Sequence, residues 1–376
     1  MMRIGFDAKR AFFNYSGLGN YSRNIIQYLH AYYPDNEYFL YVPYKLKSTS
    51  IHNSPGQNLI YPEGLLSRSF PSVWRSYLLP GRLDSDRIDL FHGLSNEIPF
   101  GIHKYNINSV VTIHDLIFLR YPEWYNMADR MIYRIKTHYS CRNANRIIAV
   151  SSQTKSDIIE FYKISPEKID VVYQGCDPQF YIESPQSLKE GILKKYGLSA
   201  GYLLSVGTVE KRKNLLSIVK AIHEGRIDRP LVVIGRQTSY AKVVKDYIAL
   251  YKIKNVRFLE NVPGEDLPPL YQMASIFIYP SLFEGFGIPI LEALFSKVPV
   301  ITTSGGCFSE AGGDHSIYIS PENIEQIADS IKKVLENNDL RLKMIIKGYD
   351  HVLKFNDRAI AHNIINVYKT VMEQNT

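Results

Sequence analysis

Two glutamates flank a glycine turn in the segment 280–294, which reads PSLFEGFGIPILEAL. A strand-like run ends where this segment begins, and Pro289 is a residue tolerated in the first turn of a helix. Glu284 is therefore expected on the loop, and Glu292 about one turn into the helix that follows. Two carboxylates placed at the end of a strand in this way are candidates for contacts with a polar ligand.

The position of Glu292 indicates what that ligand contains. Its carboxylate can accept two hydrogen bonds from a vicinal diol such as that of ribose. Backbone N–H groups around Phe286, Gly287 and Ile288 can hold a phosphate or hydroxyl group. The alternative, in which both glutamates are cap or surface residues, does not explain why Glu292 stands among apolar neighbours.

Three consecutive cations, Lys211, Arg212 and Lys213, stand between a strand-like run and a helical pattern. Positive charge at a helix N-terminus opposes the helix dipole, at a cost of about 0.3 kcal/mol or more per charge. A bound diphosphate would neutralise the side chains and the unpaired N–H groups. Together with the preceding Gly207 and Thr208, the pattern favours a phosphate site over a solvated lysine-rich turn.

His114 directly follows the strand-like run 108–113. An imidazole at a strand end can exchange hydrogen bonds with substrate hydroxyls and titrates near neutral pH. In the alternative interpretation, His114 caps the strand and Asp115 caps the next turn; the position favours a functional role. His92 also follows a strand-like run, and there we expect a structural role.

Gly17 and Gly19 lie in the segment Ser16–Asn20, which reads SGLGN and opens a helical pattern. Glycines at such a turn let backbone N–H groups approach a bound group closely. The segment does not match G-x-G-x-x-G, because Ser22 takes the third glycine position. A dinucleotide site of the dehydrogenase type is therefore disfavoured.

Composition limits the partners. Lys and Arg number 44 against 37 Asp and Glu, a formal charge of +7, which suits phosphorylated substrates, nucleic acid or an anionic membrane. The basic residues are scattered without a nucleic-acid-binding motif, so no nucleic acid partner is expected. Cys141, Cys176 and Cys307 are too far apart for a disulfide framework or zinc site and favour a reducing compartment. With no signal-like or membrane-spanning run, the expected location is cytoplasmic, with contact at the inner face of the cell membrane left open.

The elements that must position these residues alternate between strand and helix in two series. The first strand candidates are 2–6, 37–42, 88–92, 108–113, 146–150 and 169–173, with helical patterns at 20–33 and 152–162. The second series has strand candidates at 202–207, 230–235, 255–260, 275–280 and 298–303. This order predicts an α/β protein with two tandem Rossmann-like domains, each a doubly wound parallel sheet. We place the domains at 1–180 and 181–355, with a polar linker near 178–190, and a last helix at about 356–376 that is free to pack on the first domain.

The motifs together resemble the retaining glycosyltransferase family four, whose enzymes have the GT-B architecture with a cleft between two domains. Its most specific mark is the glutamate pair Glu284 and Glu292 in EGFGIPILEA. The resemblance extends over nearly the whole chain, through the segments 17–19, 114–115, 148–155, 172–177, 210–214 and 309–314. Thr208 stands where many relatives carry arginine, and Arg212 would supply that charge, as in the branch whose loop reads E-x-R-K-N.

This resemblance implies a role for each candidate residue. The second domain would bind the nucleotide sugar: Glu292 the ribose, Glu284 and the backbone of Phe286 and Gly287 the sugar, and Arg212 and Lys213 the diphosphate. In the first domain, which would take the acceptor, His114 would contact the transferred sugar, and the loop at Gly17 and Gly19 would close over the phosphates. The departing diphosphate would assist deprotonation of the acceptor, so that neither a metal nor a cofactor is required.

The sequence thus leads us to expect a metal-independent, retaining hexosyltransferase of surface polysaccharide or lipopolysaccharide synthesis. Our best guess for the donor is GDP-mannose, because the E-x-R-K-N branch resembles mannosyl- and rhamnosyltransferases. The expected partners are the nucleotide-sugar donor and a glycan or polyprenyl-linked acceptor, with peripheral membrane contact left open. The alternatives are a nucleotide-sugar epimerase on the same architecture and a non-catalytic nucleotide-sugar-binding partner, although the intact Glu284, Glu292 and Lys213 argue against the latter.

Overall fold

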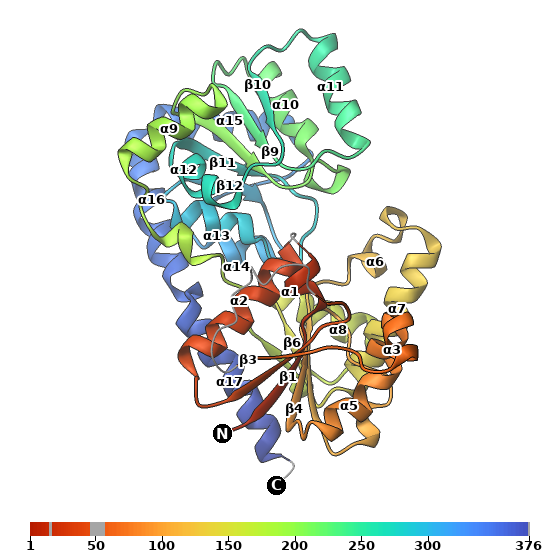
Figure 1. The fold of residues 1–376 in the computed structure, drawn as a ribbon. Coiled ribbons are helices and arrows are strands. Elements are labelled where there is room, and N and C mark those ends of the chain that lie inside the picture. The colour runs from red at the N-terminus through yellow and green to blue at the C-terminus, as the bar shows by residue number, and fades with distance from the viewer. Residues whose placement is uncertain (15–16, 46–56, 375–376) are drawn as a thin grey trace. The chain divides into compact units, whose positions relative to one another are not determined.

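The computed structural model describes residues 1–14, 17–45 and 57–374, and the chain divides into two compact units (Figure 1). Unit 1 comprises Met1–Gly175 and Asp357–Thr376, and unit 2 comprises Cys176–Asn356. Ser16 of the glycine motif lies outside the described residues. Each unit is built around its own parallel sheet, which confirms the predicted pair of α/β domains.

Unit 1 contains a seven-stranded sheet in the order β3-β2-β1-β4-β5-β6-β7, with every neighbouring pair parallel. Its strands are β1 (Arg3–Asp7), β2 (Glu37–Tyr41), β3 (Gln57–Ile60), β4 (Leu90–Gly93), β5 (Asn108–Ile113), β6 (Arg146–Ala149) and β7 (Ile169–Val171). The chain moves outward from β1 to β3 and then returns to the other side of β1. The strand order therefore switches between β1 and β4, the kind of position at which such sheets bind ligands.

Helices cover both faces of this sheet (Figure 1). They are α1 (Lys9–Phe13), α2 (Gly17–Tyr32), α3 (Leu65–Ser69), α4 (Pro71–Val73), α5 (Leu79–Ser85), α6 (Ile117–Arg120), α7 (Met127–Asn143), α8 (Ser152–Tyr162) and α17 (Asp357–Glu373). Successive strand residues point to opposite faces, so that Leu40 enters one core and its neighbour Tyr41 the other. Ile364 and Tyr368 of α17 are buried in the same core as Ile25 of α2. The last helix of the chain thus completes one face of unit 1.

Unit 2 contains a six-stranded sheet in the order β10-β9-β8-β11-β12-β13, again parallel throughout. Its strands are β8 (Tyr202–Val206), β9 (Leu231–Ile234), β10 (Val256–Leu259), β11 (Ala274–Tyr279), β12 (Val300–Thr303) and β13 (Ile317–Ile319). Its helices are α9 (Gln186–Tyr196), α10 (Leu215–Glu224), α11 (Tyr240–Leu250), α12 (Leu267–Gln272), α13 (Ile288–Phe295), α14 (Cys307–Gly312), α15 (Ile324–Glu336) and α16 (Asn338–Val352). Here the strand order switches between β8 and β11.

Two strands were not expected from the sequence. β3 has only two apolar residues among its four, and β13 is three residues long, so neither produces a run that stands out. Both follow a neighbouring strand at the edge of a sheet, and their place is decided by pairing with β2 and β12. Among the described helices, none is both long enough and apolar enough to cross a membrane.

Candidate active site

In unit 2, a cluster of charged side chains joins the loop that follows β8 to the loop that follows β11. These are the two strands between which the strand order switches. Oε1 of Glu284 lies 2.6 Å from Nζ of Lys213, and Oε2 lies 2.6 Å from Nη1 of Arg212. Arg212 also pairs with Glu210 at 2.6 Å. Burial alone would raise the pKa of Glu284, but Lys213 and Arg212 lower it to about 2. Glu284 is therefore a carboxylate held between two cations.

The sheet explains why these residues meet although they are far apart in sequence. β8 and β11 pair in parallel, so that the loops leaving their carboxyl ends lie side by side. The amide of Leu282 donates to the carbonyl of Arg212 at 2.8 Å, and the Arg212 side chain donates to the carbonyl of Phe283 at 2.9 Å. Backbone pairing and side-chain pairing thus fix the two loops together.

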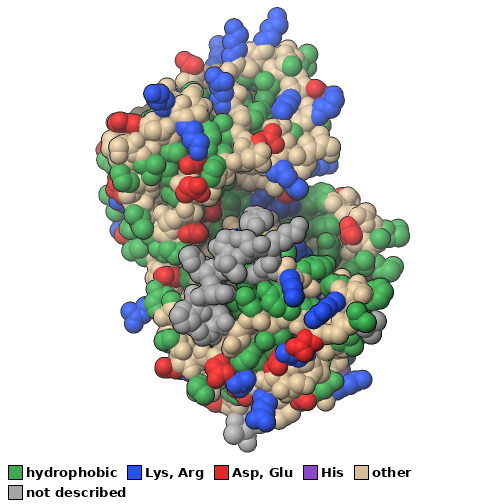
Figure 2. Space-filling view, viewed as in Figure 1, with side chains coloured by type: hydrophobic (Ala, Val, Ile, Leu, Met, Phe, Trp, Pro, Cys, Tyr) green, Lys and Arg blue, Asp and Glu red, His purple; other side chains and the backbone are tan. Residues whose placement is uncertain are grey.

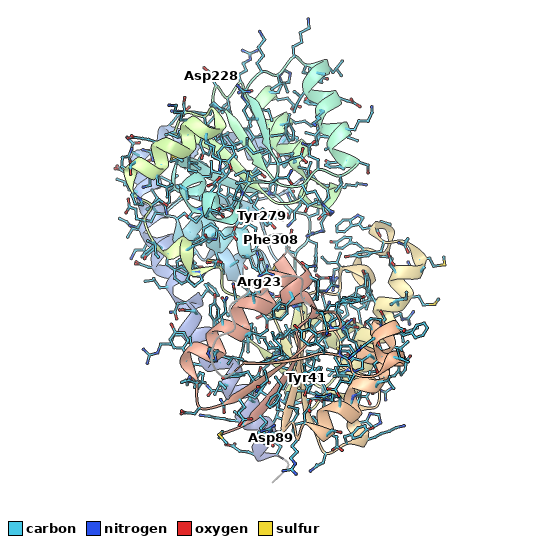
Figure 3. The ribbon with its side chains drawn as sticks, viewed as in Figure 1. Arg23, Tyr41, Asp89, Asp228, Tyr279 and Phe308 are labelled. Atoms are coloured by element: carbon cyan, nitrogen blue, oxygen red, sulfur yellow. The ribbon has the colours of Figure 1, made fainter. Side chains whose placement is uncertain are left out.

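Tyr279, the last residue of β11, forms the base of this cluster. Its hydroxyl donates to Oε1 of Glu284 at 3.0 Å and also contacts Nζ of Lys213. The Lys213 ammonium lies 4.7 Å from the centre of the Tyr279 ring. The ring of Tyr279 also packs on Phe308 of α14, with ring centres 6.5 Å apart (Figure 3). The sequence analysis did not select Tyr279, although its place at a strand end beside the glutamate motif was a usable signal.

Arg212 and Lys213 do not lack a counter-charge, so the prediction that their positive charge is uncompensated without a ligand is wrong. Arg212 and Lys213 lie in a 3-10 turn, Lys211–Lys213, and both are already paired with Glu284. Burial lowers the pKa of Lys213, and the Glu284 carboxylate opposes this effect. The protein therefore supplies the counter-charge that the sequence interpretation assigned to a ligand. A diphosphate would have to share these cations with Glu284.

Glu292 lies on α13, and its Oε2 accepts a hydrogen bond of 2.7 Å from the hydroxyl of Tyr271. Burial raises the pKa of Glu292 to about 7, and Asp177 adds to this, while the bond from Tyr271 lowers it. Tyr271 is fully buried in α12. It gave no signal in the sequence, because it lies outside every motif and reaches Glu292 only through the packing of α12 on α13.

The glycine turn shapes the start of α13. Gly287 has φ +116°, a conformation that side-chain-bearing residues rarely adopt, and forms the N-cap that precedes Ile288. Phe286 is buried and packs on Phe355 with ring centres 5.6 Å apart. Phe286 therefore anchors the turn in the core of unit 2 while Gly287 gives it the required backbone shape.

Gly207 and Thr208 immediately follow β8. The amide of Gly207 donates to the carbonyl of Ile234 at 2.9 Å. Gly207 has φ +140°, a conformation that side-chain-bearing residues rarely adopt, and its Cα lies beside the Lys213 side chain. The structure thus places Gly207 and Thr208 near the cation loop, in the same unit as Glu284 and Glu292.

His114 lies in unit 1, and both of its ring nitrogens are already used. Nε2 bonds to the carbonyl of Leu94 at 2.8 Å, and Nδ1 accepts from the Gln174 amide at 2.9 Å. The edge of Tyr21 packs on the ring at 4.7 Å. Burial lowers the pKa of His114 to about 4. The expectation that His114 titrates near neutral pH is therefore wrong, since the buried imidazole stays neutral there.

The neighbours of His114 fit the structural alternative. Asp115 caps the next turn, because its Oδ1 accepts from the amide of Ile117 at 3.1 Å. His92 is fully buried, with Nδ1 2.6 Å from the Tyr368 hydroxyl and Nε2 2.8 Å from the Thr112 hydroxyl. The structural role expected for His92 is confirmed.

The two glycines of the first motif differ in their surroundings. A Cβ on Gly19 would lie 1.7 Å from the carbonyl oxygen of Asn14, whereas a Cβ on Gly17 would meet nothing within 4 Å. Gly19 is therefore required by close packing of the protein on itself. Gly17 is exposed at the first position of α2, where it leaves open space.

Two family models match separate stretches of the chain. Residues 15–180 match the model described as Glycosyltransferase Family 4, and residues 194–351 match Glycosyl transferases group 1. The chain is 31% identical over 287 residues to the O-antigen chain mannosyltransferase B of Escherichia coli, and the match covers 74% of each protein. The chain therefore belongs to the group 1 and family 4 glycosyltransferases, as the motifs indicated.

Two further similarities agree with this assignment. The chain is 28% identical over 237 residues to the O-antigen chain mannosyltransferase RfbU of Salmonella typhimurium, a match that covers 60% of this chain and 63% of that protein. Its fold is similar to that of the sucrose-phosphate synthase from Thermosynechococcus elongatus, with a TM-score of 0.80 and 17% identity over the full length of both chains. The latter similarity confirms the GT-B arrangement of two parallel-sheet domains.

Proposed function

We propose that this glycosyltransferase moves mannose from GDP-mannose to a glycan or lipid-linked acceptor in surface polysaccharide synthesis. The two relatives named above are both O-antigen chain mannosyltransferases. The segment Glu210–Asn214 reads EKRKN, which fits the E-x-R-K-N loop of the mannosyltransferase-like branch. The observation that carries the proposal is the pairing of Glu284 with Lys213 and Arg212 at the switch point of the unit 2 sheet.

The proposed reaction retains the configuration at the anomeric carbon. The bond from that carbon to the diphosphate oxygen breaks, and a bond to the acceptor oxygen forms on the same face. The proton of the acceptor hydroxyl passes to the departing diphosphate. Lys213 and Arg212 would stabilise the negative charge that develops on the diphosphate, and preorganised charges of this kind are a large source of catalysis. Glu284 would hold both cations in position before the donor binds.

Glu292 would bind the ribose of the donor. Oε2 of Glu292 accepts from Tyr271, which fixes the orientation of the carboxylate. Further lone pairs on the carboxylate can accept from the ribose hydroxyls. Gly287 and Ile288, at the start of the same helix, would present backbone N–H groups to the donor. We further propose that no metal or cofactor takes part, so that turnover persists in excess EDTA.

The test is product analysis with a panel of nucleotide sugars and a lipid-linked saccharide acceptor. GDP-mannose should be the preferred donor, and proton NMR should show the α-anomer in the product. Lys213→Gln and Glu284→Gln should each lower kcat by about 100-fold, as expected for loss of a charge aligned with the transition state. Lys211→Gln is the matched control, because Lys211 is exposed and should keep its activity.

Three results would contradict the proposal. Full turnover in both Lys213→Gln and Glu284→Gln would remove the site assignment. A preference for a UDP- or dTDP-sugar would refute GDP-mannose as the donor, but it would still agree with glycosyltransferase activity. Conversion of the nucleotide sugar to an epimer in acceptor-free buffer would favour the epimerase alternative.

A surface of unit 1 supports peripheral contact with an anionic membrane, which we also propose. Hydrophobic side chains gather over α6 and α7 (Figure 2), and Met127, Met131 and Ile135 of α7 are 72%, 59% and 56% exposed. Arg130 and Arg134 lie among them and form no ion pair with another described residue. Apolar and basic residues on one helix are typical of binding to the surface of an anionic bilayer.

Vesicle sedimentation tests this contact. The protein should sediment with vesicles containing phosphatidylglycerol and not with pure phosphatidylcholine. Met131→Ser with Ile135→Ser should reduce the bound fraction several-fold, whereas Leu342→Ser with Ile346→Ser, exposed apolar residues of unit 2, should not. Equal binding to both kinds of vesicle, or equal loss in both double variants, would refute the assignment to α7.

A further inference from the structure

Unit 1 contains a cavity of about 330 Å³ to which the sequence assigned no role. It opens where β1, β4 and β5 end, at the switch point of the unit 1 sheet, and all of its lining residues belong to unit 1. Its volume is at the lower end of the range for small-molecule sites, about 300–1,000 Å³. The cavity thus has the location and size of a ligand site.

Its floor is a closed network of charges. Arg75, only 9% exposed, pairs with both Asp7 and Glu97, and Glu97 also pairs with Lys136 at 2.7 Å. Burial alone would raise the pKa of Glu97, but Arg75 and Lys136 lower it to about 2. Arg75 lies in a π-helical turn, Trp74–Leu78, an irregularity that is frequent at functional sites. These charges satisfy one another and form a rigid base.

Two further cations line the cavity without partners. Lys9 and Arg10 of α1 border it, and neither forms an ion pair with any residue in the part of the chain that the structure describes. Burial lowers the pKa of Lys9, and the nearby Arg75 adds to this. A bound anion would offset the repulsion between these positive groups. Asp7 and Glu97 oppose the effect of burial on the pKa of Lys9. In the lining as a whole the cations Lys9, Arg10, Arg75 and Lys136 outnumber the carboxylates Glu97 and Asp115, so the cavity is positive on balance.

Aromatic and apolar side chains make up another part of the lining, the aromatic wall. Phe118 of α6 and Tyr133 of α7 both line the cavity, with ring centres 5.8 Å apart, and Tyr125 meets Tyr133 at 6.2 Å. Ile132 adds an aliphatic surface. Such a wall can bind a sugar ring or the start of an isoprenoid chain beside a charged group. Ile132 and Tyr133 belong to α7, the helix that carries the exposed apolar residues described above.

We infer that this cavity binds the acceptor through a phosphate group, which Lys9 and Arg10 hold while the aromatic wall covers the apolar or sugar part attached to it. This inference rests on the proposed function only in naming the ligand as the acceptor of the reaction. The phosphate site itself follows from the residues that line the cavity. Lys9 and Arg10 would be binding residues. The shared chemistry is a phosphate ester, whether it belongs to an isoprenoid diphosphate or to a sugar phosphate.

Calorimetric titration of the full chain with farnesyl diphosphate, farnesol, mannose 1-phosphate and inorganic diphosphate tests the inference. The double variant Lys9→Gln, Arg10→Gln should raise the Kd for farnesyl diphosphate at least tenfold. Lys104→Gln with Lys163→Gln removes the same charge from exposed positions of unit 1 and should change it less than twofold. Farnesol should bind at least tenfold more weakly than its diphosphate. Binding of mannose 1-phosphate or inorganic diphosphate that also depends on Lys9 and Arg10 would support the inference.

A second variant pair separates this site from the donor site. Arg212→Gln with Lys213→Gln should leave the Kd for farnesyl diphosphate within twofold of the original value. If only that pair weakens binding, or if farnesol binds as tightly as the diphosphate, the inference is overturned. Binding that depends on Lys9 and Arg10 in a protein that transfers no sugar would refute the proposed function and leave the phosphate site standing.

Discussion

The hydroxyl of Tyr271, a fully buried residue, lies 2.7 Å from Oε2 of Glu292. Burial raises the pKa of Glu292 to about 7, so that a site proposed to bind ribose changes charge at physiological pH. An ionised carboxylate accepts hydrogen bonds from hydroxyl groups more strongly than a protonated one. This relationship leads to two predictions about Glu292.

The affinity for the nucleotide should rise with pH. Between pH 6 and pH 8 Glu292 loses its proton, and we expect the Kd for GDP to fall by about tenfold, in line with a charge-assisted bond of about 1.4 kcal/mol. Glu292→Gln should bind GDP weakly at both pH values. Calorimetric titration at several pH values measures this, and Lys211→Gln serves as the control. A pH dependence that persists in Glu292→Gln would show that another group titrates.

The substitution Glu292→Gln should stabilise unit 2 against unfolding at pH 8. The folded protein keeps the proton on Glu292 up to about pH 7, whereas the unfolded chain loses it near 4.5, so stability is lost as pH rises between these values. Glu292→Gln removes this loss, on the order of 3 kcal/mol at pH 8, and should make little difference at pH 4.5. Denaturation followed by circular dichroism measures it. Equal effects at both pH values would contradict the assigned pKa.

Unit 1 should lose stability in mild acid. Burial lowers the pKa of His92 to about 3 and that of His114 to about 4, so the folded state stays unprotonated while the unfolded chain binds protons below about pH 6.5. Each histidine contributes a slope of about 1.4 kcal/mol per pH unit between 6.5 and its folded pKa. Both tryptophans, Trp74 and Trp124, belong to unit 1, so their fluorescence follows its unfolding selectively.

The variant His114→Gln should remove one histidine's share of this slope, about 1.4 kcal/mol per pH unit between about pH 4 and pH 6.5, whatever it does to the stability at pH 7. His103→Gln, at an exposed position of unit 1, is the matched control. If the slope in His114→Gln equals that of the original protein, the buried imidazole does not titrate as the structure indicates.

The two glycines of the first motif should respond differently to alanine. Gly19→Ala would bring its Cβ within 1.7 Å of the Asn14 carbonyl oxygen, so that the backbone must shift, at a cost of about 2 kcal/mol or more. Gly17→Ala meets no atom within 4 Å and should change stability by less than about 0.5 kcal/mol. Tryptophan fluorescence during urea denaturation measures both. Similar losses in the two variants would show that the close approach to Asn14 is not the cause.

The sequence predicted the architecture because long buried strands leave a clear pattern. Every expected strand overlaps an observed one, and the helix expected at 152–162 has these bounds in the structure. The pairing of Glu284 with Lys213 could not be read in the same way, since it depends on β8 lying next to β11. Parallel pairing brings together residues 71 positions apart, and no local pattern records it.

The surroundings of His114 also depend on distant segments of the chain, which the local sequence does not record. Its position after β5 was correct, but its burial comes from Tyr21 of α2 and from Gln174, which belong to distant segments. These contacts occupy the ring and move its pKa away from neutrality. A strand-end position therefore indicates where a side chain lies, while the surrounding helices decide whether it stays available.

The place of α17 in unit 1 sets an order for biosynthesis. Ile364 and Tyr368 share a core with Ile4 and Phe6 of β1, so the core of unit 1 is complete only once α17 has been made. Unit 2, encoded between them, has all of its strands and core residues available before α17 leaves the ribosome. A chain cut before residue 357 would thus keep every residue of unit 2, but would leave the core of unit 1 without the helix that completes it.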